Sequence, residues 1–80
     1  MTTRPDHEIR HGFIVVRVWR KKARGKRRFS VSVARLFRNG EEWKESTRFH
    51  RKDIPVVRLA LDEAYVWIHE NQRHIEEVAK

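Results

Sequence analysis

The alternation of residues 28–37 is the feature that most restricts the fold of this 80-residue chain. The segment RFSVSVARLF places one set of mostly apolar side chains on one face: Phe29, Val31, Val33, Arg35 and Phe37. The other face carries small side chains and one leucine: Ser30, Ser32, Ala34 and Leu36. This period of two predicts a strand that is buried on one face. Asn39-Gly40 follows at once and is the strongest short signal for a β-hairpin.

Two more segments predict strands on either side of it. Residues 13–21 read FIVVRVWRK, which is rich in β-branched and aromatic residues and too short for a typical helix. We expect Ile14, Val16 and Val18 to form the core face of this strand. Residues 41–49 read EEWKESTRF and predict the third strand. One of its faces carries Trp43, Glu45, Thr47 and Phe49.

Burial of the apolar faces sets the expected register. A two-residue turn at Asn39-Gly40 would send Trp43 away from the face that carries Phe37. We therefore predict a three-residue loop, with Gly40 in the left-handed conformation, that brings Trp43 to the core face and Arg35 near Glu45. The same argument pairs Ile14, Val16 and Val18 with Val33, Val31 and Phe29. The result is an antiparallel three-stranded meander.

A helix is predicted after the sheet, with Asp53 as its N-cap and Pro55 in its first turn. Its apolar stripe consists of Ile54, Val57, Ala60, Leu61, Ala64 and Ile68, with Tyr65 beside it. Residues 1–11 are polar and lack a period, so we expect a mobile arm there and a single domain over residues 12–80. The predicted fold class is α+β: a three-stranded antiparallel β-meander followed by one long C-terminal helix packed on one sheet face.

The segment between the first two strands is strongly basic. Residues 17–28 hold eight basic side chains and no acid: Arg17, Arg20, Lys21, Lys22, Arg24, Lys26, Arg27 and Arg28. The whole chain has a net charge of +8, so the rest of it is neutral overall. Such a concentrated positive field usually has a polyanion as its partner. The alternative is a solvated hairpin tip that keeps the protein soluble.

The sheet face away from the helix is expected to combine an aromatic ring with cations: Arg17, Trp19, Lys44 and Arg48. Bases of a single strand stack on such a ring, while Lys and Arg follow the phosphates. We therefore predict a nucleic-acid-binding module for single-stranded DNA or RNA with low sequence specificity. For Trp19 a second interpretation stays open, in which the ring is buried against another subunit.

The predicted helix also carries apolar residues away from its core stripe: Val56, Leu59, Val66 and Trp67. A group of this kind indicates an interface and favours a helix-mediated homodimer. The alternative function is accordingly a protein-interaction or oligomerisation module, whose basic loop contacts an acidic protein partner.

The sequence gives no basis for an enzyme. There is no cysteine, the five histidines are dispersed, and no acidic pair shares a helix face. His7 and His11 have a spacing that could clamp a metal, but they lack other obvious ligands. We expect no catalytic residue, metal site, cofactor or small-molecule substrate. No apolar run approaches the ~20 residues of a membrane span, which favours a cytoplasmic protein that does not bind membranes.

The C-terminal two-thirds resembles a family of small bacterial and phage-like domains. The resemblance is carried by residues 39–46 (NGEEWKES), Phe49, residues 53–55 (DIP) and residues 64–68 (AYVWI). It implies a turn, a strand, a helix cap and a core stripe, and it implies no activity. More distantly, the expected architecture is similar to that of the transcriptional-coactivator and Whirly type of single-strand binder, whose members dimerise and bind single-stranded DNA through sheets and basic loops.

Overall fold

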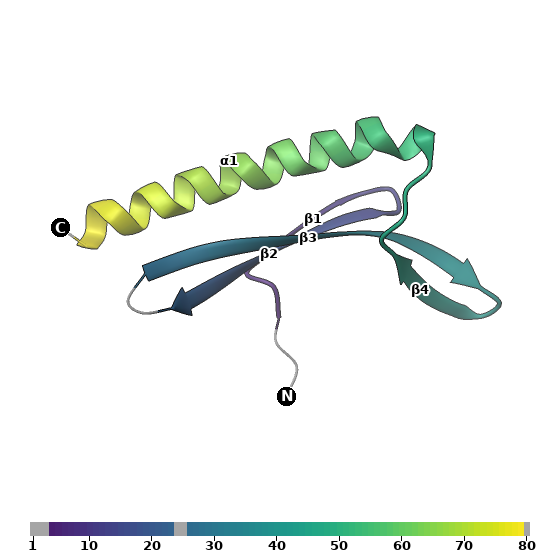
Figure 1. Ribbon diagram of the computed structural model, residues 1–80, viewed down its shortest axis with the longest axis horizontal. Helices are drawn as coiled ribbons and strands as arrows, with labels where there is room; N and C mark the ends of the chain where they lie inside the picture. The colour runs from purple at the N-terminus through teal and green to yellow at the C-terminus, as the bar shows by residue number, and fades with distance from the viewer. Residues whose placement is uncertain (1–3, 24–25, 80) are drawn as a thin grey trace.

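The computed structural model describes residues 4–23 and 26–79, and the side chains of residues 4–21 and 28–72. Over these residues the chain forms four strands, β1 (His7–His11), β2 (Ile14–Ala23), β3 (Lys26–Asn39) and β4 (Glu42–Ser46). A 3-10 turn, η1 (Arg51–Asp53), leads into the single helix, α1 (Ile54–Ala79). The strands form one antiparallel sheet in the order β1-β2-β3-β4, and α1 runs along one side of it (Figure 1). The predicted α+β class, with an antiparallel sheet and a C-terminal helix, is confirmed.

The predicted number of strands is wrong, because β1 lies in the segment that we expected to be an arm. His7 pairs with Val18 and His11 with Ile14. Gly12 has a φ of 60° in the tight turn between β1 and β2. Ile9 is only 9% exposed and supplies a core side chain. One isoleucine among polar residues gives too weak a pattern to predict a strand.

The core lies on one face of β1 and β2. It is a single cluster of buried side chains: Ile9, Ile14, Val16, Val18, Ala60 and Ala64. The core face that we predicted for β2 is thus confirmed. Ala60 and Ala64 are four residues apart on α1 and are fully or almost fully buried. Their small side chains let the helix backbone come close to the strands.

The register between β2 and β3 differs from the prediction by two residues. Val16 pairs with Val33 and Val18 with Val31, so the apolar faces coincide as expected. The partner of Phe29, however, is Arg20. In this register the pairing of β2 with β3 extends to Ala23, which pairs with Lys26. Strand structure therefore continues into the segment that we expected to be a basic loop.

The register between β3 and β4 corrects a second prediction. Asn39 pairs with Glu42, so the turn contains two residues rather than three. Gly40 has a φ of 67°, as its predicted left-handed conformation requires. Trp43 pairs with Arg38 and lies on the face away from α1, not in the core. Burial does not select the register here, because this hairpin projects beyond the start of α1 and only Ser46 of β4 is even half-buried (Figure 1).

The turn before α1 differs in detail from the predicted cap. Asp53 is the last residue of η1, and its Oδ2 accepts a hydrogen bond of 2.8 Å from the backbone N–H of His50. The Asp53 N–H donates in return to the carbonyl of His50 at 2.9 Å. Asp53 thus closes the turn that precedes the helix, while Pro55 lies in the first turn of α1 as predicted.

Candidate nucleic-acid interface

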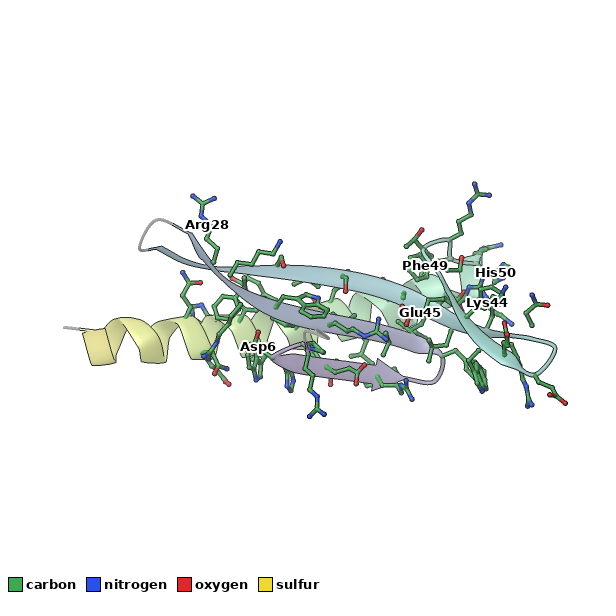
Figure 2. The ribbon with its side chains drawn as sticks, turned by 90° about the horizontal axis from the view of Figure 1, so that it is seen from below. Asp6, Arg28, Lys44, Glu45, Phe49 and His50 are labelled. Carbon is green, nitrogen blue, oxygen red and sulfur yellow. The ribbon has the colours of Figure 1, made fainter. Side chains whose placement is uncertain are left out.

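The sheet has one face that α1 does not cover, here called the free face, and Figure 2 is seen from its side. Strand pairing places on it every second residue of each strand. Its charged and aromatic members from the strands are Glu8, Arg10, Arg17, Trp19, Lys21, Arg28, Arg38, Trp43 and Glu45. Between them lie smaller polar and apolar side chains of β2 and β3.

The basic segment forms an extension of the sheet. Pairing of β1 with β2 ends at Val18, whereas β2 and β3 stay paired as far as Ala23 and Lys26. Residues 19–23 and 26–30 therefore form a two-stranded projection, called the ribbon below (Figure 1). On the free face of the ribbon, Trp19 lies opposite Ser30 and Lys21 lies opposite Arg28. An aromatic ring and two cations are thus neighbours.

Trp19 is held in place but remains accessible. Its indole Nε1–H donates to Ser32 Oγ at 3.4 Å, and its side chain is half-buried. Together with Lys21 and Ser30 these two residues line a shallow hollow. Lys21 and Arg28 are both exposed, and Arg28 points away from the ribbon in Figure 2. The hollow can accept a flat ring, with two cations beside it.

Arg17 does not serve as a free cation. Its two terminal nitrogens donate to the two oxygens of Glu45, both at 2.9 Å, and its Nε donates to Glu8 at 3.3 Å. This pairing across the sheet raises the pKa of Arg17 and lowers the pKa of Glu45. The predicted phosphate-binding role of Arg17 is therefore not supported. Instead, Arg17 binds both acids that the strands bring to the free face, Glu8 and Glu45, and its charge offsets one of their two negative charges.

We expect Arg17→Met to raise the pKa of Glu45 towards its ordinary value, which an NMR titration of the Glu45 carboxyl carbon would measure. In the wild type the folded-state pKa is lowered, so the pair stabilises the fold above pH ~4.5 and stops doing so as the pH falls through the folded-state pKa. Because the pair is partly exposed, we expect it to contribute less than about 1 kcal/mol. An unchanged Glu45 pKa in the variant would contradict the bidentate contact.

Two predicted site residues lie on the other face of the sheet. Arg20 follows Trp19 and therefore points to the α1 side, where its guanidinium lies 5.7 Å from the ring centre of Phe29 and contacts Asn71. Lys44 pairs with Phe37 on that same side, because the two-residue turn reverses the expected faces of β4. Neither residue shares a face with Trp19, so the predicted placement of Lys44 on the free face is wrong, while the binding roles of Arg20 and Lys44 stay predictions.

The remaining predicted cations fall into two groups. Arg48 follows β4, and its backbone N–H donates to Ser46 Oγ at 3.0 Å while its carbonyl accepts from Arg35 Nε at 3.1 Å. Its side chain is exposed. The predicted residues Lys22, Arg24, Lys26 and Arg27 have side chains outside the described residues. The backbone of Lys22 pairs with that of Arg27 in the ribbon.

The four residues of α1 that were predicted to form an interface fall into an exposed pair and a pair that packs against the core. Leu59 and Val66 are 51% and 52% exposed, as an interface requires. Val56 and Trp67 instead pack against the core, and the Trp67 ring stacks on His7 at 4.7 Å between ring centres. The stripe that faces the sheet thus includes these two residues. Three residues expected in the stripe or beside it are substantially exposed: Ile54, Leu61 and Tyr65.

A second aromatic group on the free face was missed by the sequence prediction. The rings of Phe13 and Trp43 stack with their centres 5.9 Å apart, and the Arg38 guanidinium lies 6.0 Å from the centre of Trp43. The two residues of the turn are Gly40 and Glu41, and this turn places Trp43 on the same face as a two-residue turn at Asn39-Gly40 would have done. The predicted three-residue loop would instead place Trp43 on the core face.

Comparisons with protein-family models, with curated proteins and with solved structures find no match for this chain. The resemblances noted in the sequence therefore stay predictions. Among the described residues, no three His, Asp or Glu side chains are grouped so that they could hold a metal ion. In the same part of the chain, no helix is long and apolar enough to cross a bilayer.

Proposed function

We propose that this chain is a nucleic-acid-binding module that binds single-stranded DNA or RNA with low sequence specificity. The observation that carries the proposal is the free face of the ribbon, where the accessible ring of Trp19 adjoins Lys21 and Arg28. Base stacking on an aromatic ring and phosphate contacts from adjacent cations are the two contributions on which non-specific single-strand binders depend.

The distribution of charge supports an anionic ligand on this face. The sequence has no Asp or Glu between Glu8 and Glu41, a stretch that includes all of β2 and β3. Glu8 and Glu45 on the free face are both bound by Arg17. Among the side chains that the structure describes, the remaining free-face cations of the strands are Arg10, Lys21, Arg28 and Arg38. The described part of α1 instead presents three exposed acids, Asp62, Glu63 and Glu70, against one exposed cation, Arg58. A polyanion is therefore attracted to the sheet and not to the helix.

The geometry favours a single strand over a duplex. Trp19 offers the face of a ring in a shallow hollow, and only an unpaired or splayed base can stack on it. Stacking and phosphate contacts accept any base, which accounts for the low sequence specificity that we propose.

Binding to a labelled single-stranded 12-mer is expected to weaken steeply with salt. If about five phosphates are contacted, log Kobs should fall against log salt with a slope near −3.5. Trp19→Ala should weaken binding about 5- to 150-fold, the equivalent of ~1–3 kcal/mol for one stacked base. Fluorescence anisotropy at several salt concentrations measures both effects.

Tyr65→Ala is the matched control for this experiment, because Tyr65 is an exposed aromatic residue, 70% accessible, on α1. It should leave the affinity unchanged. A salt-independent interaction, or no binding at low salt, would contradict the proposal. It would favour the second candidate function instead, a protein-interaction or homodimerisation module that uses the exposed Leu59 and Val66 of α1.

A further inference from the structure

We infer that Phe13, Trp43 and Arg38 form a second base-stacking site on the free face, called the distal site below. This inference rests on the proposed function and extends it. A single strand would then be held at two places, by Trp19 at the ribbon and by the distal site near the β3–β4 turn.

The exposure of the two rings is the first support. Phe13 is 61% exposed and Trp43 is 56% exposed, although their rings are already stacked on each other. The mutual stacking stabilises the protein itself. It leaves more than half of each side chain in water, so the pair still offers apolar ring surface to a ligand. A flat base can extend the existing stack.

The positions of the two side chains are fixed by backbone structure. Phe13 lies in the turn between β1 and β2, and its carbonyl accepts a hydrogen bond of 2.7 Å from the N–H of Leu36 on β3. Trp43 is paired with Arg38 across the β3–β4 ladder. Arg38 is fixed in turn by its Nε, which donates to the carbonyl of Gly40 at 3.2 Å. Such pre-organisation reduces the conformational entropy that these side chains lose when a ligand binds.

Charge identifies the occupant as a nucleic acid. Arg38 lies against the Trp43 ring and supplies a cation where the phosphate of a stacked nucleotide would lie. Of the three acids in the turn and β4, Glu45 is bound by Arg17 and Glu42 belongs to the α1 side, which leaves Glu41 in the turn. An apolar protein segment would gain nothing from the positive charge of Arg38. A stacked, negatively charged nucleotide uses both the rings and the cation.

The path between the two sites fits a short single strand. Trp19 and Phe13 are six residues apart in the sequence, and β2 rises about 3.3 Å per residue, which gives a span of about 20 Å. At ~3.4 Å per stacked nucleotide this span needs about six nucleotides, and fewer if the strand is extended. The side chains of β3 along this path are small, Ser32 and Ala34. The Arg17–Glu45 pair also lies on this path, so a strand that reaches both sites must pass over that pair.

The test uses the full chain with labelled oligothymidines of four and twelve nucleotides. Trp43→Ala should weaken binding of the 12-mer about 5- to 150-fold, as expected for one lost stacked base. It should change binding of the 4-mer by no more than about twofold, because a short strand still occupies the Trp19 site. Phe13→Ala should act in the same way. Tyr65→Ala, which removes an even more exposed aromatic residue on α1, should change neither.

The outcomes separate this inference from the proposed function. If Trp19→Ala weakens the 12-mer while Trp43→Ala and Phe13→Ala do not, the distal site is overturned and the proposed function stands. If the wild type binds neither oligonucleotide at low salt, the proposed function fails and the distal site fails with it. If the two alanine variants lose their fold, acrylamide quenching of the tryptophan fluorescence of Trp19→Phe tests the distal site instead. In that variant the bound 12-mer should protect Trp43, the more exposed of the two remaining tryptophans, from quenching by acrylamide. Quenching that the 12-mer does not diminish would overturn the distal site.

Discussion

The double variant Lys21→Ala/Arg28→Ala is expected to bind a single-stranded 12-mer about 25-fold more weakly at 0.1 M salt. Lys21 and Arg28 lie opposite each other on the free face of the ribbon. On this face they are the next pair after Trp19 and Ser30. Each phosphate contact contributes about 0.7 to the salt slope of a single strand, so two lost contacts lower log Kobs by ~1.4 at this salt concentration, relative to 1 M. Anisotropy titrations at four salt concentrations should show the slope itself becoming shallower by ~1.4.

The matched control removes two cations elsewhere. Lys52 in η1 and Arg58 in α1 are both exposed, and Lys52→Ala/Arg58→Ala lowers the net charge of the chain by the same amount. If binding depended only on overall charge, the two double variants would weaken it equally. We expect the control to keep nearly the wild-type slope, and an equal loss in both would remove the ribbon from the proposed site.

The sequence located the basic residues of the ribbon but not their strand structure. Alternation identified the core face of β2 and the apolar face of β3, and both faces lie where they were expected. It could not locate the end of the hairpin, because a strand of consecutive cations has no apolar face to distinguish it from a loop. The residues predicted as a basic loop are therefore mostly strand, and Arg20 alternates away from Trp19.

The errors elsewhere have a common physical cause. Register prediction assumes that a large apolar side chain is buried, and this holds only where a second layer covers the sheet. The β3–β4 hairpin projects beyond the start of α1, so Trp43 could stack on Phe13 at the free face instead. On α1 the same assumption misplaced Tyr65, which is 70% exposed. Trp67 was misplaced in the opposite sense, because it was expected away from the core stripe and instead packs against the core beside His7.

Ile14→Ala is expected to lower the free energy of unfolding by about 2–5 kcal/mol, the usual cost of truncating a fully buried isoleucine. Ile14 is 2% exposed and lies in the cluster that joins β1 and β2 to Ala60 and Ala64 of α1. A domain of this size has a total stability of roughly 4–12 kcal/mol, so the loss would be a large fraction of it. Urea unfolding followed by far-UV circular dichroism measures the change.

Ile54→Ala is the matched control, because it removes the same atoms from an isoleucine that is 55% exposed at the start of α1. We expect it to change stability by less than about 0.5 kcal/mol, since alanine also has the higher helix propensity. The comparison tests whether α1 covers the β1–β2 face in solution. If the helix stood away from the sheet, Ile14 would be as exposed as Ile54, and the two substitutions would cost similar amounts. A difference of several kcal/mol between the two substitutions therefore requires that α1 packs on the β1–β2 face. That packing leaves the opposite, free face of the sheet as the surface available to a ligand.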